Sequence, residues 1–351
     1  MRRFRSVLAV ALVAGTLASG AGTGPPVSAA SLNGRIAFTR CDSHSCQIYT
    51  ANPDGSAIQR VTSGGDSFQA DWSPDGTQLA YVGTASGDLA IWIVNADGTQ
   101  PVQLTRDDPD SDTFWPRFAP GGRRILFTSC GGADCDGGIG SVRTDGTHER
   151  LVTPHSGHSY NVADQSTPGG RLTYMRWHVD GVKMAIYVSR ADGSNERRIT
   201  PPRLQGWYPD WSPLGREIVF ADEVFWDRPS PSLWKVRPNG NQLRPLTHPP
   251  LPHSDVEPAY SPDGTKMIFQ SDRRYEDFCC GDLFTVDAGG GNLQRIHLPY
   301  DAYDPRWGTA PLLPASAHGN APVSAGVGGS PCANVAALAG LPICGAATAA
   351  G

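Results

Sequence analysis

A six-residue pattern, Asp71-Trp72-Ser73-Pro74-Asp75-Gly76, recurs along most of the chain and limits what the chain can fold into. Variants of it occupy residues 117–122, 165–170, 210–215 and 259–264, and a shortened copy occupies 306–308. The positions equivalent to Trp72 are predicted at 72, 118, 166, 211, 260 and 307, so the intervals are 46, 48, 45, 49 and 47 residues. A repeat of this length indicates supersecondary units that are stacked or arranged around an axis.

Each copy of the pattern is typical of a tight turn between two β-strands. Proline presets φ at the first central turn position, and Asp-Gly or Gly-Gly supplies residues that tolerate positive φ. An apolar strand that ends in an aromatic residue follows, as in Leu79-Ala80-Tyr81 and Ile218-Val219-Phe220. A second turn of the Asp-Gly or Asn-Gly kind comes later in most units, and an apolar-Thr pair such as Val61-Thr62 closes the unit. We therefore predict four short strands in each unit.

The first unit lacks an opening strand of its own. The chain enters the repeat at residues 33–38, which match the second strand of the other units, and residues 303–307 supply a spare first strand at the other end. In a ring of units the two ends can share one sheet, which leaves no terminal sheet edge unpaired. We predict an all-β fold, a six-bladed β-propeller of four-stranded antiparallel blades over residues 30–308, closed by N- and C-terminal strands in one blade.

The copies at 71–76, 210–215 and 260–264, together with the Asp-Gly turns and the closing apolar-Thr pairs, resemble the repeat of the TolB-like, WD40-like propeller family. The resemblance covers nearly the whole chain after its first 29 residues. It implies a six-bladed propeller that acts as a binding scaffold, because TolB proteins are periplasmic scaffolds of the Tol-Pal system.

The two ends of the chain differ in composition from the repeat. Residues 1–29 form a predicted signal peptide, with a basic start, an apolar run at 7–18 and small residues at 27–29. That apolar run is too short and too rich in glycine for an integral membrane span. Residues 309–351 are rich in Ala, Gly and Pro, which predicts a flexible tail. We expect secretion to the periplasm or cell envelope.

Eight cysteines fit an oxidising compartment. Three pairs are predicted disulfides: Cys41 with Cys46, Cys130 with Cys135, and Cys332 with Cys344. The first two pairs lie in equivalent loops with the same spacing, so each can close a hairpin mouth. A zinc site that also uses Asp42, His44 and Asp134 is the rival interpretation of these two pairs. The pairing of Cys279-Cys280 is not indicated by the sequence.

Loops that enter the first strand of each unit, and loops that follow the second strand, are expected on one face of the propeller. Carboxylates, imidazoles and aromatic rings on these loops suit a cation, a sugar or a peptide end. The predicted ligand-binding residues are Asp66, Asp112, His158, Trp207, Tyr208, His253, Asp255 and Asp301. A net charge of −5 and the lack of a basic stripe argue against a nucleic-acid partner.

Two functions of different classes follow from these observations. The first is a secreted, monomeric scaffold that binds a protein, peptide or glycan on its loop face, without a cofactor and without catalysis. The second is a propeller enzyme, a lyase or hydrolase acting on carbohydrate, with a metal at the channel mouth held by residues among His158, His253, Asp255 and Asp301. The absence of a recognisable catalytic motif favours the scaffold.

Overall fold

The structure of the protein is a computed structural model that describes residues 33–106, 111–131, 136–153, 158–165, 170–178, 184–222, 232–274 and 281–314. Every regular element within these residues is a β-strand. The described residues contain no helix that is long and apolar enough to cross a membrane. The predicted signal peptide lies outside them.

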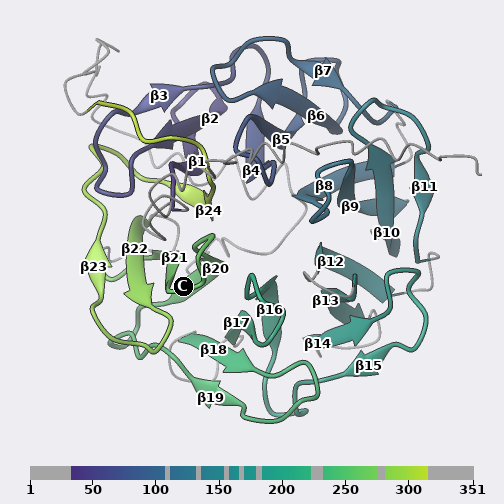
Figure 1. Cartoon of the computed structure of the whole chain (residues 1–351), viewed down its shortest axis with the longest axis vertical. Coiled ribbons are helices and arrows are strands. Elements are labelled where there is room, and N and C mark those ends of the chain that lie inside the picture. The colour runs from purple at the N-terminus through teal and green to yellow at the C-terminus, as the bar shows by residue number, and fades with distance from the viewer. Residues whose placement is uncertain are drawn as a thin grey trace, which may run out of the picture.

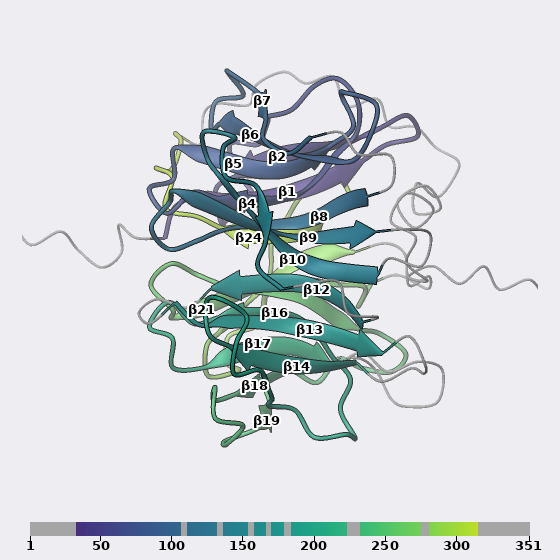
Figure 2. The same ribbon diagram turned by 90° about the vertical axis from the view of Figure 1, so that its right-hand side faces the viewer.

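The strands form six four-stranded antiparallel sheets arranged in a ring, which confirms the predicted propeller (Figure 1). In each sheet, or blade, one strand lies next to the central channel and a two-residue strand lies at the rim (Figure 1). Seen from the side, the long strands run between the two faces of the disc (Figure 2).

Each blade contributes four strands, ordered from the channel to the rim. Blade 1 contains β24 (Tyr303–Trp307), β1 (Ile36–Cys41), β2 (Cys46–Ala51) and β3 (Gln59–Arg60). Blade 2 contains β4 (Ser67–Trp72), β5 (Gln78–Gly83), β6 (Ala90–Asn95) and β7 (Val102–Gln103). Blade 3 contains β8 (Ser111–Phe118), β9 (Arg124–Gly131), β10 (Asp136–Arg143) and β11 (Arg150–Leu151). Blade 4 contains β12 (His158–Gln165), β13 (Leu172–His178), β14 (Met184–Ser189) and β15 (Arg197–Arg198). Blade 5 contains β16 (Gly206–Trp211), β17 (Ile218–Asp222), β18 (Ser232–Val236) and β19 (Arg244–Pro245). Blade 6 contains β20 (Asp255–Tyr260), β21 (Lys266–Ser271), β22 (Asp282–Asp287) and β23 (Gln294–Arg295).

Blade 1 is assembled from both ends of the repeat region, as predicted. Strand β24 pairs antiparallel with β1, and Ile36 lies opposite Trp307 in that ladder. The indole Nε1 of Trp307 also donates to the carbonyl oxygen of Gly34 at 2.9 Å. The first and last strands of the propeller therefore close the ring through a shared sheet.

Residues 309–314, the first part of the predicted tail, lie against the propeller. The Arg35 amide donates to the Ala310 carbonyl at 2.9 Å, and Ala310 is only 2% exposed. The Asn52 side chain bonds the backbone of Leu313 in both directions, at 2.8 and 3.0 Å. Residues 315–351 lie outside the described part of the chain.

The repeated Ser-Pro-Asp-Gly turn is stabilised by its own side chains. Ser73 Oγ accepts the Gln78 amide at 2.9 Å, and Asp75 Oδ1 accepts the Ser73 hydroxyl and the Thr77 amide at 2.7 and 3.0 Å. Short polar side chains in turns often bond backbone groups two residues on. The side chains of the motif therefore build the turn.

The closing threonine of five units accepts one hydrogen bond from the third strand of its sheet. In blade 1, Thr62 Oγ1 accepts the amide of Ile48 on the third strand at 2.9 Å. The same bond recurs in blades 2 to 5, where the acceptors are Thr105, Thr153, Thr200 and Thr247. A hydroxyl thus satisfies a buried amide after the short fourth strand has ended.

The third copy of the pattern, which lies in blade 4, differs by one residue from our prediction. Gln165 lies opposite Leu172 in its ladder, as Trp72 lies opposite Leu79 in blade 2. Gln165 therefore occupies the Trp72 position, where we predicted Ser166. The prediction was wrong because the copies were aligned on their prolines, and in the third copy the proline comes one residue later.

The channel strand of each blade carries a β-bulge near its middle. In blade 2 the bulge lies between Phe68 and Asp71, and it contains Gln69 at a φ of 59°. Equivalent residues with positive φ in four other blades are Trp115, Tyr208, Glu257 and Asp304. A bulge redirects a side chain and increases local twist. In this ring it changes which side chains reach the channel.

Candidate functional site

The two faces of the ring are defined by their connections. The turn face holds the Ser-Pro-Asp-Gly turns and the second Asp-Gly turns, and the loop face holds the other connections. Two kinds of loop meet on the loop face, because Thr84 after β5 donates its amide to the Asp66 carbonyl before β4 at 3.0 Å. In blade 6 the Asp272 amide reaches the Ser254 carbonyl at 3.4 Å in the same way. The loops predicted to share one face therefore do so.

A disulfide between Cys41 and Cys46 closes the β1–β2 hairpin on the loop face. Its S–S bond leaves neither sulfur as a thiolate, so the zinc interpretation does not apply to this pair. Cys130 is also disulfide-bonded. Its expected partner Cys135 lies outside the described residues, as do Cys279, Cys280, Cys332 and Cys344.

Asp66 and Asp112 occupy the loop face at two different blade junctions. Asp66 Oδ1 accepts the amide of Cys46 at 2.8 Å, so it connects blade 2 to the disulfide-closed hairpin of blade 1. The side chain of Asp112 is exposed, yet some desolvation of its carboxyl group and the nearby carboxylate of Asp88 raise its pKa. Asp66 is therefore committed to a structural contact, whereas Asp112 faces solvent.

Trp207 and Tyr208 are buried in β16, with 3% and 5% of their surfaces exposed. Tyr208 meets Trp115 of blade 3 edge to face, with ring centroids 6.3 Å apart. Blade 4 lies between these two blades in the ring, so the contact is made across the channel (Figure 1). The two aromatic rings therefore fill part of the channel.

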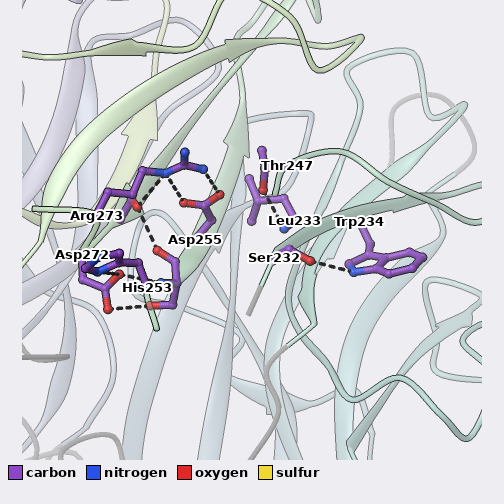
Figure 3. Close-up of polar contacts among 10 residues, drawn as sticks. Ser232, Leu233, Trp234, Thr247, His253, Asp255, Asp272 and Arg273 are labelled. Carbon is purple, nitrogen blue, oxygen red and sulfur yellow. Dashed lines mark hydrogen bonds and ion pairs between the residues drawn. The ribbon is translucent and has the colours of Figure 1, made fainter. Parts of the chain in front are cut away.

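His253 and Asp255 come together in blade 6, but each has a partner (Figure 3). Asp255 is fully buried and accepts two bonds from the guanidinium of Arg273, at 3.0 and 2.5 Å. His253 Nδ1 lies 3.8 Å from Asp272 Oδ1. Burial raises the pKa of Asp272, and its bonds to Ser254 and the charge of His253 oppose that shift.

The remaining predicted residues are Asp301, which is half-buried before β24, and His158, the first residue of β12, whose side chain is not among those described. The predicted residues lie in, or directly before, the channel strands of all six blades. In the described part of the chain, no group of three or more His, Cys, Asp or Glu side chains is placed to hold a metal ion.

A ring of charged side chains around the channel was missed by the sequence analysis. Asp71, Asp164 and Asp210 are half-buried, and each accepts a backbone amide of the following blade through Oδ2. The distances are 2.7, 2.7 and 2.8 Å, and the donors are Phe118, Trp211 and Tyr260. These carboxylates therefore join neighbouring blades.

A second layer of junctions uses the bulge residues themselves. Gln69 Oε1 accepts the Trp115 amide at 2.9 Å, and Glu257 Oε2 accepts the Asp304 amide at 2.8 Å. Thr39 donates its hydroxyl to Asp304 Oδ2 at 3.1 Å, and its oxygen accepts the Gln69 amide at the same distance. The bulge thus places polar side chains where the next blade offers a backbone amide.

The channel environment changes the acidity of its carboxylates. Burial raises the pKa of Asp71, and the positive charge of Arg117 opposes the shift. Burial and the like charge of Asp164 raise the pKa of Asp210 well above its ordinary value. Burial also raises the pKa of Asp304. Water that is lost on burial would otherwise stabilise the ionised form.

These channel residues had a signal in the sequence. A charged residue directly precedes the aromatic position of the repeat at Asp71, Arg117, Asp164, Asp210 and Arg306. Charges inside an otherwise apolar strand require partners when they are buried. The repeat was interpreted as turn chemistry, and so this position received no role.

Comparison with known proteins agrees with the fold. Residues 23–251 match the family model described as the TolB beta propeller domain. An uncharacterized protein of Agrobacterium fabrum is 32% identical over 160 residues, 45% of this chain and 52% of that protein. A TolB homolog of Chlorobium luteolum is 30% identical over 152 residues, 43% of this chain and 32% of the homolog. The matched segments thus span about half or less of these relatives.

Solved structures show the same architecture. TolB of Acinetobacter baumannii superimposes with a TM-score of 0.63 at 19% identity, covering 79% of this chain and 67% of that protein. A putative TolB of Agrobacterium tumefaciens gives a TM-score of 0.58 at 20% identity, covering 79% and 92%. The family match covers well over half of the chain, and the chain therefore belongs to the TolB β-propeller domain family.

Proposed function

We propose that the protein is an exported scaffold that binds a protein partner on its loop face, without catalysis and as a monomer. The observation that carries the proposal is the contrast between the two faces. The turn face repeats the same turns, whose polar groups hydrogen-bond within the turn itself. The loop face varies from blade to blade in its cysteines, ion pairs and aromatic residues. Loops that vary on a rigid frame are where binding residues concentrate.

Two further observations support this proposal. The disulfide at Cys41–Cys46 fits a protein that matures in an oxidising compartment. A relative of Gluconobacter oxydans, 33% identical over 94 residues that make up 25% of this chain and 20% of that protein, is the Tol-Pal system protein TolB. A role in a protein assembly is the function that the family membership favours. A peptide or glycan ligand on the same face is the finer alternative within this proposal.

Site-specific photo-crosslinking in the producing cells tests the proposal. A benzophenone amino acid in place of Ser63 or His44 lies on the loop face, and both residues are exposed. The same amino acid in place of Leu214, which is 63% exposed on the turn face, is the matched control. We expect a protein adduct from the loop-face positions only. Adducts from Leu214 alone, or none from any position, would refute the proposal.

A further inference from the structure

Arg40, at the loop-face end of β1, packs over two neighbouring tyrosine rings. Its guanidinium carbon lies 4.0 Å from the Tyr300 ring centroid and 5.4 Å from that of Tyr49. Its Nη1 donates to the Tyr49 hydroxyl at 3.2 Å. A guanidinium has five N–H donors. Stacking on aromatic faces restricts its position and leaves the edges of its plane available for further bonds.

Arg40 forms no ion pair with a carboxylate among the described residues, although its positive charge, after the hydrogen bonds from His44 and Ser45, also lowers the pKa of Asp42. The nearest acidic residue in sequence, Asp42, uses its Oδ1 to accept the amides of His44 and Ser45 at 2.9 and 3.0 Å. Arg40 is half-buried, so its charge is partly removed from water. A partly desolvated charge without a directly bonded counter-ion is unfavourable, and a bound anion would relieve that cost.

The repeat provides an internal comparison in blade 4. Phe38 of blade 1 and Tyr174 of blade 4 are equivalent, because each lies opposite a tyrosine of the third strand, Tyr49 or Tyr187. Arg40 and Arg176 each follow two residues later in the same strand, so Arg176 occupies the Arg40 position. The Arg176 guanidinium lies over the ring of that tyrosine, Tyr187, at 5.6 Å. The same arginine-on-tyrosine arrangement therefore occurs in blade 1 and in blade 4.

The two blades differ in the counter-ion. In blade 4, Glu196 forms an ion pair with Arg176, and its other oxygen accepts the Tyr174 hydroxyl at 2.6 Å. The residue two positions before the fourth-strand arginine is Glu196 in blade 4 and Ile58 in blade 1. Blade 1 thus keeps the arginine and its aromatic support but lacks the glutamate.

We propose that Arg40, supported by Tyr49 and Tyr300, is an anchor for a carboxylate side chain of a protein partner. The site deepens the proposed function, since it names one contact of the loop face. Arginine binds carboxylates through two parallel N–H bonds, and a support that fixes its plane favours that geometry. The Cys41–Cys46 disulfide directly after Arg40 further fixes the end of the strand.

The test uses the full mature chain with labelled arginine side chains, observed by NMR through their Nε–H groups. The probe is N-acetyl-glutamate N-methylamide, and the glutamine analogue is the matched neutral control. We expect a saturable shift of the Arg40 signal with the glutamate probe, at least tenfold weaker binding of the glutamine probe, and no shift at Arg176. Equal shifts at Arg40 and Arg176, or equal responses to the two probes, would overturn the proposal.

Two substitutions sharpen the test. Ile58→Glu supplies the missing carboxylate from within the chain, so it should have a higher melting temperature than Ile58→Gln, which loses the same apolar packing, and it should weaken the glutamate probe at least tenfold. Ile58→Gln is the neutral control of similar size and should retain binding. Arg40→Gln should abolish the response. Unchanged probe binding in both Ile58→Glu and Arg40→Gln would overturn the proposal.

A sugar acid is the alternative source of the carboxylate. If galacturonate, with its carboxylate free, binds at Arg40 tenfold more tightly than the glutamate probe, the assignment to a protein partner is wrong. Loop-face cross-links that persist unchanged in Arg40→Gln, together with a silent Arg40 signal, would remove this anchor and leave the proposed scaffold intact. Binding of the glutamate probe at Arg40 without any loop-face adduct would keep the carboxylate site and refute the proposed scaffold.

Discussion

The channel wall and the turn face use the same residue type, aspartate, in opposite ways. Asp71 and Asp75 are four residues apart in one copy of the repeat. Burial in the channel wall raises the pKa of Asp71, whereas hydrogen bonds from Ser73 and Thr77 on the exposed turn lower the pKa of Asp75. The motif therefore contains two carboxylates with different duties. One joins neighbouring blades, and the other stabilises a turn within its own blade.

The same contrast recurs in blades 5 and 6. Burial raises the pKa of Asp210 on β16. At Asp263 after β20 burial also acts to raise the pKa, but the hydrogen bonds of the turn together outweigh it and lower the pKa. Within the repeat, the balance between burial at the channel position and hydrogen bonds at the turn position decides the direction of the shift, because desolvation and hydrogen bonding act oppositely on an ionised carboxylate. Four predictions test this difference between the two regions, beginning with the largest effect.

Trp211→Ala should lower the free energy of unfolding by about 3 to 5 kcal/mol, as expected for removal of a large buried aromatic side chain. Trp211 is 5% exposed and its amide bonds Asp164 of the preceding blade. Leu214→Ala, three residues later on the turn face, is the control and should change stability by less than about 0.5 kcal/mol. Chemical denaturation measures both. A loss below about 1 kcal/mol for Trp211→Ala would mean that this ring does not pack between blades.

Asp210→Ala should cost about 1 to 3 kcal/mol, because the Tyr260 amide loses its acceptor. Asp210→Asn keeps a side-chain oxygen and removes a charge that lies close to Asp164. We expect the asparagine variant to be at least as stable as the natural protein at pH 7. If the asparagine variant is as unstable as the alanine variant, the charge itself is required and the contrast between channel wall and turn face fails.

Much of this architecture could be predicted from the sequence, and the reasons are local. The turn chemistry of Ser73 to Gly76 is contained within six residues, and the closing threonines lie 14 residues from the amides that they bond. The blade shared by the two ends of the repeat region was predicted because the first unit lacks a first strand and the last residues of the repeat supply one. These features repeat, so several copies support each interpretation.

The channel ring and Arg40 could not be predicted in the same way. Asp71 and Asp210 bond amides that lie 47 and 50 residues further along, in the following blade, and only the ring closure brings them together. The β-bulge that turns Gln69 and Tyr208 toward the channel has no distinctive residue. Trp207 is buried beside the bulge of β16, and Asp255 is buried together with its partner Arg273. Neither position follows from the loops that led us to predict these residues.

The stability of the natural protein and of Asp210→Asn should diverge with pH. The folded-state pKa of Asp210 is raised, so the folded protein binds the proton more tightly than the unfolded chain. Stability must then fall as pH rises from the unfolded value through the folded-state pKa. Denaturation of both proteins across the acidic and neutral range should give a difference that grows in favour of the asparagine variant over that window and then stays constant. A difference that does not change with pH would contradict a raised pKa at Asp210.

Asp75→Ala should have the smallest effect, a loss of about 0.5 to 1 kcal/mol at pH 7, because water can replace the bonds of an exposed turn. Asp75 has a lowered folded-state pKa, so its contribution is present above the unfolded value and is lost as pH falls through the folded-state pKa. The difference between the natural protein and Asp75→Ala should therefore shrink on acidification. At Asp210, by contrast, acidification removes the charge that burial opposes, so the two aspartates should give pH slopes of opposite sign. Thr77→Val, which removes one donor to Asp75 and keeps the carboxylate, should show a smaller slope than Asp75→Ala. Slopes of the same sign at Asp75 and Asp210 would show that distance from the channel does not control these carboxylates, and the division of the repeat into a channel position and a turn position would have to be abandoned.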